Sequence, residues 1–188
     1  MCEHIEDLHE GERWVDSICI SRKYIVTHCN KGVVDSKMFL MHTNVRDTSI
    51  ADEQLHGTMA IVHGFAENSD VHLESAMQYA LNGFDVQLID LRGYGMSGGF
   101  RMTNNWVHDY HYDVASLLKQ SNPLLPLFLY GHSMGGLAIT TFLLNNPALK
   151  ISGVILSAPF LNFHENKAID EQKRFLVNAM APHLEVTI

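Results

Sequence analysis

The residues best suited to do chemistry are a serine flanked by glycines, the segment Gly-His-Ser-Met-Gly at positions 131–135. A short apolar run, Leu127–Tyr130, precedes this motif, and an apolar helical pattern, Leu137–Leu144, follows it. Strand, sharp turn and helix in this order are typical of a nucleophile elbow, which holds a serine hydroxyl clear of the sheet. The two glycines are needed because a side chain at either place would crowd the strand or the helix. The pattern therefore predicts nucleophilic catalysis by Ser133, and the alternative interpretation is an ordinary loop.

An acyl-transfer site also needs two hydrogen-bond donors for the oxyanion that forms during attack. The Met134 N–H, at the start of the predicted helix, is one candidate, because a helix N-terminus favours negative charge. The second donor is expected from the loop after a five-residue apolar run, Thr58–Val62, where His63-Gly64-Phe65 follows. The Phe65 N–H is that candidate, and the alternative is that these residues form only a turn.

A catalytic base and its orienting acid are not identified in this sequence. In enzymes with this elbow the chain order is serine, acid, histidine. After Ser133 the histidines are His164 and His183, and the acidic residues are Glu165, Asp170, Glu171 and Glu185. Most of these fall in or beside a predicted amphipathic helix, Glu165–Met180, and none follows a strand pattern. Upstream, Asp90 ends a predicted strand, and we expect it to have a structural role in the glycine-rich turn that follows.

Two other motifs are weak evidence for a binding site. The glycines at 93–98 match the dinucleotide-binding motif G-x-G-x-x-G. That motif needs a helix that starts within the glycines and an acidic residue at the end of the next strand. Here no helix is predicted to start there, and the acidic residue at a suitable distance, Asp113, falls inside a predicted helix, so no nucleotide site is expected. His108 and His111 lie beside Asp109, yet a third ligand is not evident and a solvated helix face is the expected interpretation. We expect no metal and no cofactor. Three other serines are expected to lie in loops or at strand ends: Ser69, Ser97 and Ser157.

Strand and helix patterns alternate from residue 58 to residue 157, which predicts a parallel sheet covered by helices on both faces. The predicted strands are Thr58–Val62, Asp85–Ile89, Leu127–Tyr130 and Ile151–Leu156. The predicted helices are one capped by Asp70 and stopped by Gly83, one capped by Asn104 or Asn105 and running through Leu118, and the elbow helix. Upstream, Trp14–Ile20, Tyr24–Cys29 and Met38–Thr43 predict an antiparallel meander at one sheet edge, with a turn at Asn30-Lys31-Gly32.

Composition and charge argue against nucleic-acid binding, a secretory signal and a membrane span. The 188 residues carry a net charge of −8 and show no Lys/Arg cluster, so nucleic acid is not an expected partner. The acidic start does not fit a secretory signal, and no apolar run approaches the length of a bilayer span. The three cysteines are odd in number and fit no C-x-x-C spacing, which favours free thiols in a reducing compartment. We expect one domain, residues 1–188, in the cytoplasm.

Four segments together resemble a known family: His63–Ser69, Asp90–Gly99, Gly131–Gly136 and Leu156–Pro159. In order and spacing they are similar to the monoacylglycerol lipase and lysophospholipase branch of the α/β-hydrolase superfamily, also labelled serine aminopeptidase S33-like or hydrolase-4, over about residues 40–188. The resemblance implies an eight-stranded sheet, Ser133 as nucleophile, and the N–H groups of Phe65 and Met134 as the oxyanion hole. It also implies hydrolysis of a small lipid ester, a monoacylglycerol or lysophospholipid, through an acyl-enzyme without a cofactor. Because lipid-active members carry an apolar cap, it implies peripheral contact with membranes, and it sets no oligomeric state.

The sequence departs from this family in three places. Asn68 stands where histidine is usual, and Ala66 stands where glycine is usual. Relatives continue through a cap to two further strands that carry the catalytic Asp and His, so residues 161–188 are expected to begin the cap and the last strands to be missing. Ile151–Leu156 would then be an exposed apolar edge, which is an aggregation hazard. An early-terminated product, a fragment and a degenerate paralogue all fit this pattern.

Two functions follow from these features. The first is a serine ester hydrolase whose active form is longer or is completed by another chain. The second is a catalytically inactive, hydrolase-like module that binds a lipid or a partner protein.

Overall fold

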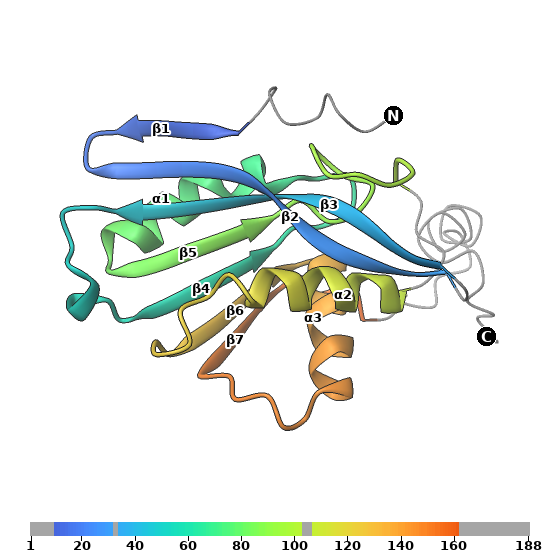
Figure 1. The fold of residues 1–188 in the computed structure, drawn as a ribbon. Helices are drawn as coiled ribbons and strands as arrows, with labels where there is room; N and C mark the ends of the chain where they lie inside the picture. Colours follow the sequence, from blue (N-terminus) through green and yellow to red (C-terminus); the bar gives the residue numbers. More distant parts are fainter. Residues whose placement is uncertain (1–9, 32–33, 103–106, 162–188) are drawn as a thin grey trace, which may run out of the picture.

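The computed structural model describes residues 10–31, 34–102 and 107–161 (Figure 1). The strands are β1 (Gly11–Val15), β2 (Ile18–Lys31), β3 (Val34–Asp47), β4 (Gly57–Val62), β5 (Phe84–Ile89), β6 (Leu127–His132) and β7 (Gly153–Ser157). The helices are α1 (Leu73–Leu81), α2 (Val107–Leu118) and α3 (Met134–Asn145), with short 3₁₀ turns η1 (Asp52–Gln54) and η2 (Ser69–His72). The predicted helix at 165–180 and the predicted caps at 104 and 105 lie outside the described residues.

These strands form one sheet in the order β1-β2-β3-β5-β4-β6-β7. The strands β5, β4, β6 and β7 run parallel to their neighbours in this group, whereas β1, β2 and β3 are antiparallel and β3 joins the parallel part by pairing with β5. The predicted mixed sheet, with an antiparallel N-terminal meander at one edge, is confirmed. Because the parallel strands share a direction, the residues that follow β4, β5 and β6 meet at one edge of the sheet.

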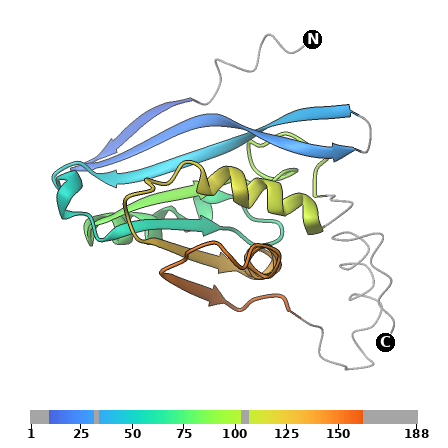
Figure 2. The same cartoon turned by 60° about the horizontal axis from the view of Figure 1, so that its bottom comes forward.

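The helices cover both faces of the sheet. Figure 1 shows α2 and α3 in front of the sheet and α1 behind it, and Figure 2 shows the same layers after rotation. The central strand β4 is buried along its whole length. Its residues Ala60 and Val62 belong to the core beneath α2 and α3, while Met59 and Ile61 belong to the core beneath α1. In the described part of the chain, no helix is long and apolar enough to cross a membrane.

The N-terminal meander differs from the expected one. The single strand predicted at Trp14–Ile20 is wrong, because β1 and β2 meet in a two-residue turn at Asp16 and Ser17, where Val15 pairs with Ile18. Asp16 has a φ of 54°, a left-handed conformation that aspartate tolerates better than most residues. The strand predicted at Tyr24–Cys29 is part of the longer β2. Lys31 pairs with Val34, so the chain reverses near the predicted turn.

The first helix starts differently from the prediction. Asp70 does not cap α1: the Asn68 side chain accepts the Asp70 N–H at 3.1 Å and begins the turn η2, which leads into α1. The Asp70 carboxylate pairs with Arg22 instead. The end of α1 is as predicted, since Gly83 follows with a φ of 83°, and a Cβ there would lie 2.9 Å from His56.

The last described strand is an apolar edge. Among the strands that the structure describes, β7 pairs with β6 alone. Val154 and Ile155 are each 42% exposed and Leu156 is 39% exposed. Within the described residues, this agrees with the apolar edge predicted at Ile151–Leu156.

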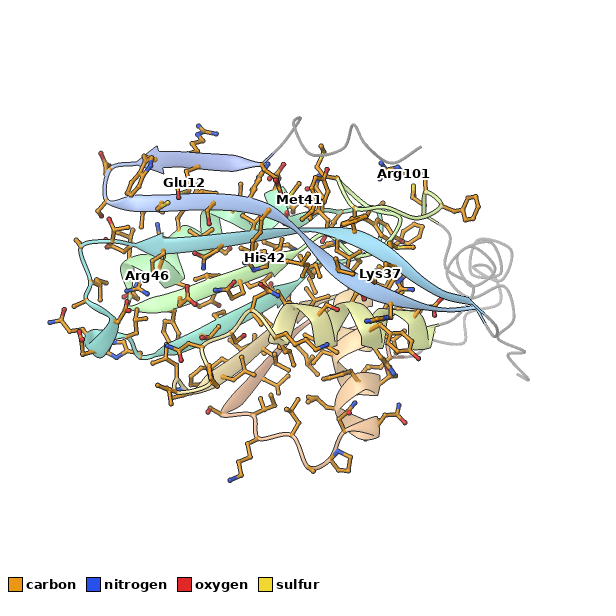
Figure 3. All side chains as sticks on the ribbon, in the orientation of Figure 1. Glu12, Lys37, Met41, His42, Arg46 and Arg101 are labelled. Atoms are coloured by element: carbon orange, nitrogen blue, oxygen red, sulfur yellow. The ribbon has the colours of Figure 1, made fainter. Side chains whose placement is uncertain are left out.

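Unfolding is expected to become easier in acid because of His42, a buried residue of β3 (Figure 3). Its Nε2 lies 2.6 Å from Gln87 Oε1 and therefore donates. Burial lowers the pKa of His42 from 6.5 to about 4, although the Gln87 hydrogen bond opposes this. The unfolded chain thus binds a proton that the folded chain does not, so this contribution is present above pH 6.5 and is lost as the pH falls towards 4.

We expect the free energy of unfolding in urea to fall between about pH 7 and pH 4.5, with a smaller slope in His42→Gln. His56→Gln, at an exposed position, is the matched control and should keep the wild-type slope. Equal slopes in wild type and His42→Gln would contradict this assignment.

Candidate active site

The site is built on the turn between β6 and α3. β6 ends at His132 and α3 begins at Met134, so Ser133 alone forms the turn. Its φ of 48° and ψ of −113° lie in a region that non-glycine residues rarely adopt, and such strain persists only where the surrounding structure imposes it. Here Ser133 N–H donates to Ser157 O at 2.9 Å, and Ser133 O accepts from Phe160 N–H at 2.9 Å. The sequence-predicted strand, turn and helix are therefore present around Ser133.

The glycines of the motif are required by close packing. A Cβ on Gly131 would lie 2.8 Å from Gly136 Cα, and a Cβ on Gly135 would lie 2.2 Å from Val62 O at the end of β4. A Cβ on Gly136 would lie 2.8 Å from the Pro159 side chain. Each contact is shorter than any ordinary one, so these glycines let α3 approach both β4 and the loop after β7.

The loop after β4 holds the predicted donor Phe65 in a defined direction. His63 is buried, and its Nε2 accepts the Leu91 N–H at 2.9 Å, so the Nδ1–H donates to Gly64 O at 2.7 Å. Burial lowers the pKa of His63, which keeps the ring neutral and this tautomer in place. Gly64 O and Phe65 N–H belong to the same planar peptide group. His63 therefore fixes the direction in which the Phe65 N–H points.

Tyr94 connects the two predicted donors. Its hydroxyl contacts Met134 Sδ at 3.7 Å, and its ring packs edge-on against Phe65, with 6.2 Å between ring centroids. Within the described residues, neither the Phe65 N–H nor the Met134 N–H donates to a protein acceptor. Sequence reasoning did not single out Tyr94, because it lies within the glycine-rich segment and no local pattern marks its side chain.

The glycine-rich loop after β5 is a structural element. Asp90 Oδ1 accepts from Ser69 N–H at 2.7 Å, and Asp90 Oδ2 accepts from Met96 N–H at 2.8 Å. Ser97 donates its hydroxyl to Asp90 O and accepts from Met41 N–H at 2.8 Å. No helix opens among residues 90–102, so the G-x-G-x-x-G segment lacks the context of a dinucleotide site. The expected structural role of Asp90 agrees with these contacts. Ser97 lies in a loop, as expected, whereas Ser69 is the first residue of the turn η2.

The histidines of α2 have other partners. His111 Nε2 lies 2.9 Å from Thr141 Oγ1, and Asp109 lies 3.7 Å from Arg92. The side chain of His108 lies outside the described residues. In the part of the chain that the structure describes, no three His, Cys, Asp or Glu residues are grouped to hold a metal ion.

No general base for Ser133 is identified among the described residues. Within them, no imidazole or carboxylate is hydrogen-bonded to the Ser133 hydroxyl. Ser157, at the end of β7, accepts the Ser133 N–H with its backbone oxygen. The remaining candidates lie outside the described residues: His164, His183, Glu165, Asp170, Glu171 and Glu185.

Comparison with known proteins places this geometry in a family. The family model described as "Serine aminopeptidase, S33" matches residues 53–187, which include β4, the glycine-rich loop and the elbow. The chain belongs to this hydrolase family. The resemblance carried by the four sequence segments is thereby confirmed, and the fold is that of the α/β-hydrolases. Ala66 has a φ of 59°, a conformation that glycine adopts more readily than alanine.

Several relatives are lipases or phospholipases by name. The chain is 30% identical over 125 residues to a monoacylglycerol lipase of Mycolicibacterium smegmatis, covering 64% of this chain and 44% of that protein. It is 31% identical over 131 residues to phospholipase YtpA of Bacillus subtilis, covering 68% of this chain and 50% of that protein. The chain thus spans half or less of the length of these two relatives.

A solved structure has the same fold. The monoacylglycerol lipase of Paleococcus ferrophilus superposes with a TM-score of 0.57 and 24% identity, covering 74% of this chain and 51% of that one. At this identity the similarity shows the arrangement of strands and helices alone, and it assigns no reaction to this chain.

Proposed function

We propose that this protein is a carboxylic ester hydrolase of the monoacylglycerol or lysophospholipid lipase type, with Ser133 as its nucleophile. The observation that carries the proposal is the strained conformation of Ser133, alone between β6 and α3. The names of the S33-family relatives support the lipid-ester class, since both a monoacylglycerol lipase and a phospholipase match this chain. The substrate is therefore a small lipid ester, and contact with a membrane surface is peripheral.

In the proposed reaction, Ser133 Oγ attacks the ester carbonyl carbon and loses its proton to a base. The carbonyl oxygen becomes an oxyanion, which receives hydrogen bonds from Phe65 N–H and Met134 N–H at the start of α3. The tetrahedral intermediate then expels the alcohol, which takes up a proton, and leaves an acyl group on Ser133. Water attacks this acyl-enzyme, releases the fatty acid and restores the serine. His63 and Tyr94 hold the two donors in place.

The second candidate is a catalytically inactive module that binds a lipid or a partner protein. The observation in its favour is that, among the described residues, the Ser133 hydroxyl has no histidine or carboxylate partner. Without a base the same elbow and donors would still form a site for a lipid carbonyl. Covalent reactivity of Ser133 distinguishes the two candidates.

Prolonged treatment of the purified chain with an alkyl fluorophosphonate is expected to phosphonylate Ser133. Phosphonylation mimics acyl transfer, because the serine oxygen bonds to phosphorus and fluoride leaves. Intact-mass and peptide mass spectrometry would locate the label, and Ser133→Ala should stay unlabelled. Ser157→Ala is the matched control and should be labelled like the wild type. Equal labelling of Ser133→Ala would contradict Ser133 as the nucleophile, and no label on Ser133 after prolonged treatment would favour the inactive module for this chain.

A further inference from the structure

One carboxylate touches both loops that supply the proposed oxyanion donors. Glu67 Oε2 accepts the Gly64 N–H at 2.8 Å and lies 3.3 Å from His72 Nε2. Glu67 Oε1 lies 3.5 Å from His132 Nε2, on the residue immediately before Ser133. The side chain thus joins the loop that carries Phe65 to the end of the strand that carries the elbow.

The contact between these loops is tight. His132 is held from its other side, since its Nδ1 lies 3.3 Å from Ser157 Oγ. A Cβ on Gly64 would lie 3.0 Å from Glu67 Oε2 and 3.0 Å from His132 Cδ2. There is thus too little room for a side chain at Gly64 between Glu67 and His132. The next peptide along the chain carries the Phe65 N–H.

The charges reinforce this contact. Burial raises the pKa of Glu67, but the Gly64 N–H and the two neighbouring histidines outweigh this effect and lower it overall. Glu67 is therefore an anion at neutral pH. Its ionisable neighbours are His72 from η2, His132 from β6 and, at longer range, His63 from the same loop.

We propose that Glu67 is a positioning residue that sets the distance between the Phe65 and Met134 N–H groups. It does so by tying the Gly64 amide to His132, one residue away from the nucleophile. This inference rests on the proposed function, because the spacing matters only if both amides bind one oxyanion. Small misplacements of such donors cost much of their stabilisation of the tetrahedral state.

Two ligands with alkyl chains that differ by one carbon separate positioning from folding. Octylboronic acid forms a bond from Ser133 Oγ to boron, gives a tetrahedral anion and releases one proton to the buffer. Octanamide is planar, neutral and forms no bond. Because the boronate adduct does not need a catalytic base at equilibrium, isothermal calorimetry on the 188-residue chain measures how well the donors are placed.

In Glu67→Ala we expect boronate affinity to fall at least about tenfold, while octanamide affinity changes less than about twofold. Glu67→Gln retains an acceptor for the Gly64 N–H and should recover part of the boronate affinity. The matched control is Glu74→Ala, at an exposed position of α1, which should bind both ligands like the wild type. His132→Ala should weaken boronate binding, and adding it to Glu67→Ala should weaken binding no further, as contacting residues are coupled.

Three results would overturn the inference. If Glu67→Ala and Glu67→Gln bind the boronate like the wild type, Glu67 does not position the donors. If both ligands weaken equally in these variants, its role is general folding. If wild type and Ser133→Ala bind the boronate equally, the proposed function fails and this inference fails with it, which distinguishes that result from the first two.

Discussion

The 188-residue chain by itself is expected to hydrolyse p-nitrophenyl octanoate at least about 10⁴-fold more slowly than a serine hydrolase with a complete triad. The histidine of such a triad takes the serine proton during attack. The sequence pattern identifies none for Ser133, and no described histidine is hydrogen-bonded to its hydroxyl. The oxyanion donors would still give a small rate above background. A steady-state assay at micromolar enzyme, with Ser133→Ala as the reference, measures this residual rate.

Two further variants identify a base if one is present. His164→Ala and His183→Ala change the two histidines that follow Ser133 in the chain, and both are expected to leave the residual rate unchanged. Rapid, Ser133-dependent turnover that disappears in either variant would contradict the expectation. It would assign the general base to the segment at 162–188.

Asp113→Ala is expected to lower the free energy of unfolding by about 3–5 kcal/mol, the usual cost of breaking a buried ion pair. Asp113 is fully buried in α2 and accepts three hydrogen bonds from Arg92: from Nη2 at 2.6 Å, Nε at 2.9 Å and the backbone N–H at 3.1 Å. Arg92 is also buried and lies in the segment that follows β5. Removing the carboxylate leaves the guanidinium without its main counter-charge in the interior.

An exposed pair provides the control. Arg46 Nη2 lies 2.9 Å from Asp52 Oδ1, and the Asp52 side chain is 82% exposed. Asp52→Ala should therefore cost less than about 1 kcal/mol, as is usual for surface ion pairs. Urea unfolding of the three proteins gives both values, and similar small losses in Asp113→Ala and Asp52→Ala would contradict the role assigned to Asp113.

Local patterns were enough to predict most elements of this fold. The apolar runs of β4, β5 and β6 are bounded by glycine or proline, and helical periodicity marks α1 and α2, so their order and the parallel sheet could be predicted. The hairpin between β1 and β2 could not. Asp16 and Ser17 lie within a run of β-branched and aromatic residues, and the turn depends on the left-handed conformation of Asp16.

The candidate site also contains residues that could be proposed from the sequence and contacts that could not. Ser133, Phe65 and Met134 could be proposed from the sequence because each belongs to a short motif with a fixed place relative to a strand end. The contacts of Tyr94 with Met134 and of Glu67 with His132 could not, because they join segments that are distant in the chain. Such contacts are set by which strands are neighbours in the sheet, and no local pattern records that.

The central claim is that Ser133 faces two backbone donors across a shared oxyanion position. A crystal structure of the chain with octylboronic acid bound tests it most directly. The account predicts boron bonded to Ser133 Oγ, with one boronate oxygen about 2.7–3.1 Å from both Phe65 N and Met134 N. Boron bonded to another residue, or a Ser133 adduct whose oxygens reach neither amide, would contradict it.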